Sequence, residues 1–390
     1  MPADHAAPSP MMPPVPAHSR SPLPHPTASR APNRAPRARG KIRRLAALAV
    51  MALLIASTSA TPSLAQERAQ DSARGKARDK VSFGTNWRAQ GGHGGFYQAQ
   101  ADGTYERYGL DVTIVQGGPQ VNNRPLLAAG KLDFLMAGNL LHSFDNARND
   151  IPTIAVAAFF QRDPQILMAH EGVYADFAAL RNARTILIGK DGQFSFWQWL
   201  KSEHGFRDEQ LRPYAFNLGP FLKDDKLVQQ GYASSEPYTA LSQGARPQVF
   251  LLADHGWSTY STTVETRAEL IRTKPDLVQR FVDASIIGWV NFLYGDHRPA
   301  YQSIRQANPE MTDALLDYEL KVFRERGIAD SGDSLTRGIG AIDMARVRGF
   351  HDKMIKAGLY KPGDVDIDKA VTDRFVNKGI GVDLRKTLTR

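Results

Sequence analysis

The sequence contains no cysteine among its 390 residues. A chain without cysteine has no disulfide framework, no thiolate metal site, no iron–sulfur cluster and no cysteine nucleophile. It also lacks the residue that carries the lipid of a bacterial lipoprotein. Other chemical signatures are missing too: there is no GxSxG nucleophile elbow, no phosphate-binding P-loop and no histidine pair at zinc-site spacing.

A basic excess is also lacking over most of the chain, although the formal net charge is +9. Residues 1–65 carry eight basic side chains and one acidic one, so the rest of the chain carries 41 basic and 39 acidic side chains. The body of the protein is therefore close to neutral. Its composition does not require a nucleic-acid or acidic-membrane partner, and we expect none.

Long apolar runs are absent except for one of about twelve residues at 45–56. Residues 1–40 hold eleven of the 24 prolines and are predicted to be a disordered leader, because such a composition buries too little apolar surface to order itself. Residues 41–65 place the basic Lys41–Arg44 before the apolar run and end at the small residues Ser63–Ala65. This order predicts a secretory signal peptide, with an uncleaved N-terminal anchor as the alternative.

The body of the chain alternates strand and helix patterns and becomes helical after residue 266. This rhythm predicts an α/β protein with mostly parallel sheets covered by helices. We expect strands at 81–87, 110–115, 132–136, 153–159, 184–189, 212–216, 228–233 and 248–252, and helices at 94–101, 124–129, 140–148, 194–204, 238–243, 267–272, 276–293, 298–306, 312–323 and 343–357.

The alternation of strands and helices occurs twice along the chain, which predicts two lobes. Residues 78–168 are predicted to form the first part of lobe 1 and 169–258 to form lobe 2. Residues 259–390 are predicted to complete lobe 1 and to add C-terminal helices. In open parallel sheets a ligand binds beyond the carboxyl ends of the strands, so we expect the ligand site in a cleft between the lobes.

Gly91–Gly95 is a glycine-rich segment that follows a strand and opens a helix. Its glycines would let a ligand approach backbone N–H groups at the helix N-terminus. Its spacing does not fit the dinucleotide-binding fingerprint. The alternative interpretation is a tight strand-to-helix turn with an exposed His93.

An ordered series of short motifs resembles one protein family. Residues 85–99 contain N-W-(x)5-H-x-G-F-Y, 105–112 read YERYGLDV, 127–134 read LAAGKLDF, 150–153 read DIPT, and 231–238 read GYASSEPY. The series is similar to the ABC-transporter substrate-binding proteins of the nitrate/sulfonate/taurine superfamily. It looks most like the branch that binds thiamine-pyrimidine precursors and riboflavin.

The resemblance implies a type II periplasmic-binding-protein fold, in which two α/β lobes close around a small ligand. It implies a soluble periplasmic receptor that is not an enzyme, needs no cofactor or metal, and delivers its ligand to an ABC-transporter permease in the inner membrane. We expect a planar nitrogen heterocycle as the ligand and a monomer as the working form.

The same branch contains an enzyme, a thiamine-pyrimidine synthase that uses its own histidine and a PLP-bearing lysine. Alignment backwards from Ile151–Pro152 places His142 on the donor histidine and Gly138 on the lysine. The synthase also requires a cysteine cluster. Without the lysine and the thiols, the resemblance does not extend to this chemistry.

The predicted ligand-binding residues follow strands or open helices in both lobes. An Asn amide and a Trp face after the first strand suit a planar heterocycle, and the branch uses a glutamate near Glu236 to accept from an aminopyrimidine. The alternatives are a core role for Trp87 and His142 and a salt-bridge role for Glu236. The full set is Asn86, Trp87, His93, Phe96, Tyr97, Asn139, His142, Gln193, Ser195, Glu236 and Tyr238.

A small anion such as nitrate, a sulfonate or taurine is the alternative ligand, because the superfamily also binds these. Arg88 and Arg162 each follow an expected strand and are the side chains that could neutralise an anion.

Overall fold

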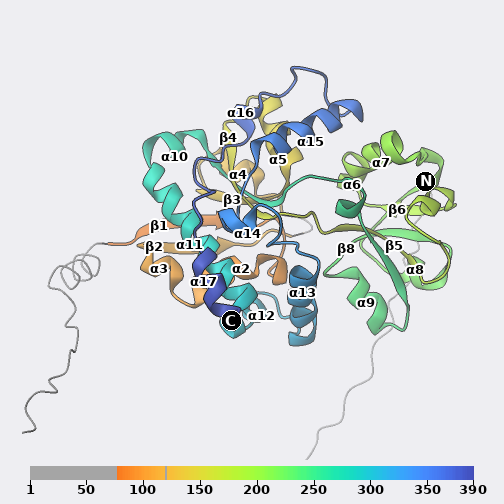
Figure 1. Cartoon of the computed structure of the whole chain (residues 1–390), viewed down its shortest axis with the longest axis horizontal. Coiled ribbons are helices and arrows are strands. Elements are labelled where there is room, and N and C mark those ends of the chain that lie inside the picture. Colours follow the sequence, from red (N-terminus) through yellow and green to blue (C-terminus); the bar gives the residue numbers. More distant parts are fainter. Residues whose placement is uncertain (1–76, 119–120) are drawn as a thin grey trace, which may run out of the picture. The chain divides into compact units, whose positions relative to one another are not determined.

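The computed structural model of the protein describes residues 77–118 and 121–390, and in this part of the chain ten strands form two sheets of five strands each (Figure 1). The predicted leader at 1–40 and the predicted signal peptide at 41–65 lie outside the described residues.

The first sheet has the strand order β2-β1-β3-β10-β4. β1 pairs in parallel with β2 and β3, and β10 lies antiparallel between β3 and β4. In this register Thr263 lies between Ala137 and Ala158. The strands are β1 (Asp79–Gly84), β2 (Leu110–Val115), β3 (Phe134–Asn139), β4 (Thr153–Phe160) and β10 (Ser261–Arg267).

The second sheet has the strand order β7-β6-β8-β5-β9. β6 pairs in parallel with β7 and β8, and β5 lies antiparallel between β8 and β9, with Leu167 between Gln230 and Phe250. The strands are β5 (Gln165–His170), β6 (Ile186–Ile188), β7 (Leu211–Pro213), β8 (Val228–Tyr232) and β9 (Pro247–Leu251).

The predicted α/β class is confirmed, but both sheets are mixed. Four strands of each sheet run in one direction, as predicted, and one strand that the sequence analysis missed runs against them. The missed β10 has a single apolar residue, Val264, so no hydrophobic pattern marked it. The missed β5 has only a short apolar run after Pro164, near the predicted lobe boundary.

Two crossover segments connect the sheets. The first, 161–164, leads from β4 into β5, so the second sheet begins before the predicted boundary at 169. The second, 252–260, leads from β9 through the 3-10 helix η4 (Leu252–His255) back into β10.

The side chain of Arg346 forms hydrogen bonds to both crossovers. Its guanidinium donates to the carbonyl of Gln161 at 2.6 Å in the first crossover, and to Ser258 at 2.9 Å and Thr259 at 3.1 Å in the second. It also lies 3.9 Å from the ring centroid of Tyr260. One side chain therefore ties together the two segments about which the sheets are joined.

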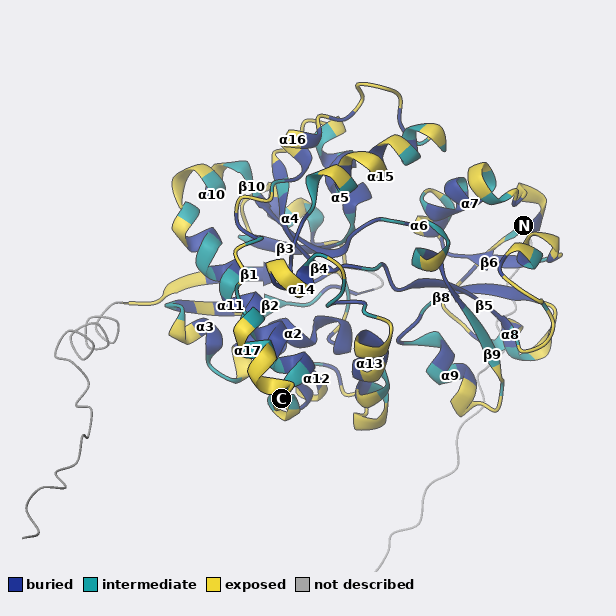
Figure 2. Ribbon diagram, viewed as in Figure 1, coloured by how far each residue is buried: buried dark blue, intermediate teal, exposed yellow. Residues whose placement is uncertain are grey.

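Helices follow the strands and fill the C-terminal part. Figure 2 shows β4 and β5 buried along almost their whole length, whereas α17 has no buried residue. The remaining elements are η1 (Gly91–His93), α2 (Gly94–Ala101), α3 (Thr104–Arg107), α4 (Arg124–Ala128), α5 (Leu140–Arg148), η2 (Ala178–Asn182), α6 (Lys190–Gln193), α7 (Phe196–His204), η3 (Asp208–Gln210), α8 (Gly219–Lys223), α9 (Glu236–Ser242), α10 (Ala268–Thr273), α11 (Pro275–Tyr294), α12 (Arg298–Ala307), α13 (Asp313–Glu325), α14 (Ser334–Arg337), α15 (Met344–Lys356), α16 (Ile367–Ala370) and α17 (Val382–Leu388).

The glycines at the start of α2 allow it to pack tightly on α11. A Cβ at Gly94 would overlap the ring of Phe292, and a Cβ at Gly95 would overlap the indole of Trp289. On the opposite helix, a Cβ at Gly288 would overlap the carbonyl of Gly95. Gly94 and Gly95, which belong to the predicted ligand loop, therefore allow the close contact between α2 and α11.

Candidate functional site

A cavity of about 970 Å³ has walls from both sheets. The first sheet contributes the loop after β1, the end of β3 and the start of α5. The second sheet contributes the segments that follow β6, β7 and β8. The cavity thus lies at the carboxyl ends of strands, where the strand-order rule places ligand sites.

The structure brings seven of the predicted ligand-binding residues into the lining of this cavity and leaves four out. The lining includes Asn86, Trp87, His93, Asn139, His142, Ser195 and Glu236 and does not include Phe96, Tyr97, Gln193 and Tyr238.

Phe96 and Tyr97 lie in the core because α2 packs its apolar residues against α11 and the first sheet. The Phe96 ring centroid lies 4.7 Å from that of Phe83 and 4.9 Å from that of Phe159, and the side chain is fully buried. Tyr97 is also buried. The structure therefore contradicts the prediction that Phe96 and Tyr97 bind the ligand.

Gln193 and Tyr238 have local partners. The amide of Gln193 donates to the carbonyl of Ile188 at 2.9 Å and closes the turn after β6. The ring of Tyr238 lies 5.3 Å from that of Tyr318 on α13. Neither side chain reaches the cavity, because each is used where its helix meets a neighbouring element.

The two histidines of the first-sheet wall are neutral. Burial lowers the pKa of His93 to about 3, and neither ring nitrogen of His93 has a hydrogen-bond partner among the described residues. Burial and the nearby Arg124 lower the pKa of His142 to about 4. Nδ1 of His142 accepts from the Gly138 N–H at 3.0 Å, so the proton resides on Nε2 and the ring offers a donor. His93 is buried, which contradicts the alternative of an exposed histidine in a turn.

Arg124 is the basic side chain of the lining, and it is engaged by its own sheet. It donates to Oδ1 of Asn146 at 3.0 Å and to the carbonyl of His142 at 3.4 Å. It also lies near the buried Glu265, whose pKa burial raises and Arg124 lowers. Two donors of the guanidinium are therefore occupied by neutral acceptors of the first sheet.

The second-sheet side of the cavity is acidic. Glu236 opens α9, and its carboxylate accepts from the N–H of Tyr232 at 2.7 Å and from the hydroxyl of Tyr214 at 3.4 Å. Burial raises the pKa of Glu236. Asp163, in the first crossover, also lines the cavity, and burial raises its pKa to about 6. Asp163 ends the segment 159–163 that follows an expected strand, so the strand-end rule pointed to it although it is not among the predicted ligand-binding residues.

Two aromatic side chains meet across the cavity. Trp87 follows β1 and Phe216 follows β7, and their ring centroids lie 6.0 Å apart at 43°. Phe216 has a positive φ of 56° and is 64% exposed. An exposed phenylalanine in a strained conformation marks a functional position more often than a packing one. The sequence pattern placed Phe216 at the end of the expected strand 212–216, whereas β7 ends at Pro213.

The two arginines proposed for anion binding do not line the cavity. Arg88 is exposed and pairs with Glu310 at 3.1 Å. Arg162 forms an ion pair with Asp254 and donates to the carbonyl of Arg326 at 2.8 Å.

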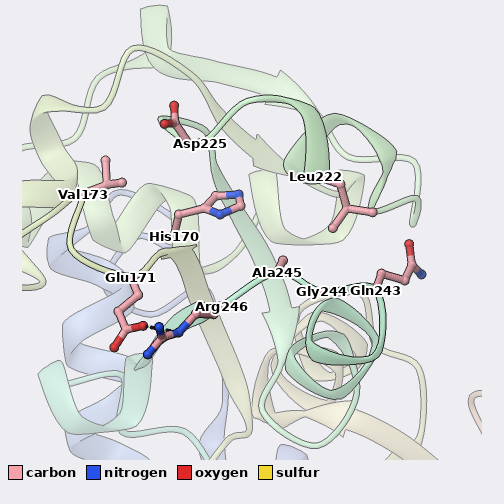
Figure 3. Close-up of a pocket in the computed structure, with 9 residues that line it drawn as sticks. All are labelled: His170, Glu171, Val173, Leu222, Asp225, Gln243, Gly244, Ala245 and Arg246. Carbon is pink, nitrogen blue, oxygen red and sulfur yellow. Dashed lines mark ion pairs between the residues drawn. The ribbon is translucent and has the colours of Figure 1, made fainter.

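A smaller hollow of about 520 Å³ lies on the second sheet (Figure 3). Glu171 and Arg246 at its rim form an ion pair at 2.7 Å, and more than half of each side chain is exposed. His170 stacks on Phe221, and its Nε2 lies 2.7 Å from the Phe221 carbonyl. Because these polar groups already have partners, we assign the candidate site to the larger cavity.

Two kinds of feature are absent from residues 77–118 and 121–390. In these ranges no helix combines the length and apolarity needed to cross a bilayer. Within the same ranges no cluster of His, Cys, Asp and Glu is placed to hold a metal ion.

Two mixed sheets of the same strand order, joined by two crossovers beside a shared cavity, define a type II periplasmic-binding-protein fold. The solved periplasmic aliphatic sulphonate binding protein SsuA from Escherichia coli is similar, with a TM-score of 0.57 over 75% of this chain and 92% of that chain, at 11% identity. Residues 90–294, just over half of the chain, match the family described as NMT1/THI5 like, and the chain belongs to that family.

Two relatives illustrate the range of this family. Riboflavin-binding protein RibY from Chloroflexus aurantiacus is 28% identical over 238 residues, which cover 59% of this chain and 66%, just under two thirds, of RibY. The 4-amino-5-hydroxymethyl-2-methylpyrimidine phosphate synthase THI11 from Saccharomyces cerevisiae is 21% identical over 257 residues, 61% of this chain and 74% of THI11. The predicted family is confirmed, and its members carry the names of both binding proteins and enzymes.

Proposed function

We propose that the protein is a periplasmic solute receptor that encloses a planar nitrogen heterocycle between its two lobes and delivers it to the permease of an ABC importer. The observation that carries this proposal is the cavity of about 970 Å³ with walls from both sheets and an aromatic ring from each. A cavity of that size suits a small organic ligand, and ring faces suit a flat one. The name of RibY supports the same ligand class.

The charge of the lining favours a heterocycle over a small anion. His93 and His142 are neutral at physiological pH, and Arg124 is engaged by Asn146 and lies near Glu265. Three carboxyl groups, Asp163, Asp191 and Glu236, also line the cavity. An anion would therefore lose its hydration in a cavity that offers the single guanidinium of Arg124 against three carboxyl groups.

The synthase alternative has little support from the residues of this chain. The position that resemblance assigns to the PLP-bearing lysine is Gly138, and a Cβ built there would come within 3.0 Å of the His142 ring. No lysine amine can form a Schiff base there, so the group does not fit this site. We therefore propose a receptor and not an enzyme.

A thermal-shift panel on the purified protein tests the ligand class, since a ligand that binds only the folded state raises its melting temperature. The panel contains riboflavin, 4-amino-5-hydroxymethyl-2-methylpyrimidine, thiamine, taurine, ethanesulfonate and nitrate. We expect at least one of the first three compounds to raise the melting temperature and the anions to have no effect. A shift with the anions alone would refute the heterocycle assignment.

A matched variant locates the binding. Trp87→Ala removes a ring from the cavity, whereas Trp199→Phe changes an indole that is buried among His204 and Trp257 of the core. The shift should shrink in Trp87→Ala and persist in Trp199→Phe. Equal shifts in the wild type and in Trp87→Ala would place the ligand elsewhere.

Delivery to an importer is tested in cells. Deleting the gene should abolish uptake of the compound that shifts the protein in vitro, and a plasmid copy should restore it. Export is tested by fractionation, with the mature N-terminus expected near residue 66.

A further inference from the structure

Asp163 has a carboxyl oxygen without a partner in the interior of the protein. The residue is 2% exposed, and its Oδ1 accepts from the N–H of Gln165 at 2.9 Å. Its Oδ2 makes no hydrogen bond to another residue of the described ranges. The Trp257 indole lies near enough to lower the pKa of Asp163, but its N–H has no hydrogen bond of normal geometry in these ranges.

The surroundings of Asp163 supply no positive charge. Its neighbour Arg162 is paired with Asp254, and Arg124 is engaged across the cavity by Asn146. Burial raises the pKa of the neighbouring Tyr232 phenol, and the charges of Asp163 and Glu236 raise it further. Asp163 therefore lies in an acidic part of the cavity.

A buried carboxyl group is costly to keep. Desolvation raises the pKa of Asp163 to about 6, although the Gln165 N–H and the Trp257 indole lower it. Glu236 has both oxygens occupied by Tyr232 and Tyr214, so it already serves as a structural acceptor at the start of α9. Asp191 also lines the cavity but is exposed. Asp163 is therefore the buried carboxyl group of the lining that keeps an oxygen for a ligand.

The position of Asp163 connects ligand binding to the crossovers. Asp163 belongs to the first crossover, and Trp257, which also lines the cavity, belongs to the second. A ligand that contacts Asp163 therefore touches the segment about which the two sheets are joined. Such a contact would favour one arrangement of the lobes over another.

We propose that Asp163 is a ligand-binding residue whose free carboxyl oxygen accepts a hydrogen bond from an amino group or a protonated ring nitrogen of the ligand. This proposal rests on the proposed function and specifies it: the ligand carries a nitrogen donor, and the donor binds at the crossover end of the cavity. Selectivity then arises because a ligand with an acceptor at that point would face a buried carboxyl oxygen.

Asp163→Asn tests the proposal with little change of shape. The asparagine keeps an oxygen for the Gln165 N–H and replaces the free acceptor by an amide N–H₂ group. The probes are 4-amino-5-hydroxymethyl-2-methylpyrimidine and its 4-oxo analogue, measured by isothermal titration calorimetry. We expect the wild type to prefer the amino compound at least tenfold, and Asp163→Asn to lose that preference through weaker binding of the amino compound.

Two controls separate a binding role from a structural one. Asp225→Asn removes an exposed carboxylate of the same sheet outside the cavity and should leave both affinities unchanged. The melting temperature of ligand-free Asp163→Asn should equal or exceed that of the wild type, because the variant no longer buries an unpaired acceptor.

The outcomes are distinguishable. If the amino compound binds the wild type and Asp163→Asn equally well, Asp163 is not a ligand residue and the proposed function stands. If Asp163→Asn loses affinity together with several degrees of melting temperature, its role is structural and the proposal is overturned. If neither pyrimidine nor riboflavin binds the wild type, the proposed function fails and this proposal fails with it.

Discussion

The two sheets have the same strand order but present different chemistry to the cavity between them. In each sheet a parallel trio is followed by one reversed strand and then by an edge strand. The first-sheet side offers neutral histidines and asparagines, whereas the second-sheet side offers carboxyl and phenol groups. Topology therefore locates the site, and a few residues at the strand ends determine what it can bind.

The largest expected effect concerns the glycines that follow β1 and β6, the middle strands of the two parallel trios. In Gly95→Ala the new methyl group meets the fully buried indole of Trp289, which has no room to move. In Gly192→Ala it meets Ile188 and Phe196, and Phe196 borders the cavity and can shift into it. We expect losses of about 3 and about 1 kcal/mol in the free energy of unfolding. Urea titration measures both, and equal losses would contradict this account.

The second largest expected effect comes from removing the hydrogen bonds by which Arg346 connects the two crossovers. Arg346→Met removes three hydrogen bonds to the two crossovers and should cost roughly 2–3 kcal/mol in the free energy of unfolding. Arg348→Met, on the same helix, removes only the exposed ion pair with Asp368 and should cost less than about 0.5 kcal/mol. A similar cost for both variants would show that Arg346 does not hold the crossovers.

The pH dependence of the free energy of unfolding distinguishes the first-sheet side of the cavity, with His93, from the second-sheet side, with Asp163. The pKa of His93 is about 3 in the folded protein, below its unfolded value, so stability is lost as pH falls below about 6.5. The pKa of Asp163 is raised to about 6, so its contribution is present at low pH and is lost as pH rises from about 4 to 6. Between pH 7 and pH 5, His93 should remove about 2 kcal/mol and Asp163 should add about 1 kcal/mol.

Each contribution is isolated by comparing pH profiles of urea unfolding. His93→Gln should flatten the fall in stability below pH 6.5, and Asp163→Asn should steepen it. The ring signals of His93 in an NMR titration give an independent measurement, because they should stay unprotonated above pH 4. Titration of His93 near pH 6.5 in the folded protein would show that the ring is not buried.

The smallest expected effect concerns the aromatic contact across the cavity. A double-mutant cycle of Trp87→Ala and Phe216→Ala on the melting of the ligand-free protein should give a coupling of about 0.5–1 kcal/mol in favour of the pair. A coupling near zero would mean that the two rings do not meet in solution.

The sequence predicted the parts of the fold that repeat a simple pattern. The helices 94–101 and 140–148 and the strand 110–115 were predicted with the bounds that the structure has. The reversed strand β10 was missed because its buried residues, apart from Val264, are serine, threonine and Glu265, which hydrophobic periodicity does not reveal. The mixed character of both sheets was missed with it.

The sequence predicted those residues of the candidate site that lie at or just after the end of an expected strand. The cavity lining includes three such residues, Asn86, Trp87 and Glu236. Phe96 and Tyr97 lie equally close to the end of β1 in the sequence. Which face of the short helix α2 is buried, however, depends on its packing against α11, nearly 200 residues away. Asp163 also follows an expected strand, whereas Phe216 was expected inside the strand 212–216 and lies beyond the end of β7 at Pro213.

The reversed strand of the first sheet has a consequence for how the polypeptide assembles. The strands of the second sheet, β5 to β9, are contiguous in the chain, so that sheet can form as soon as it has been synthesised. The first sheet remains open, with β3 and β4 unpaired on facing edges, until Ser261–Arg267 inserts between them. Closure over so long a stretch of chain is slow, and the nascent protein therefore remains incompletely folded until late in its synthesis.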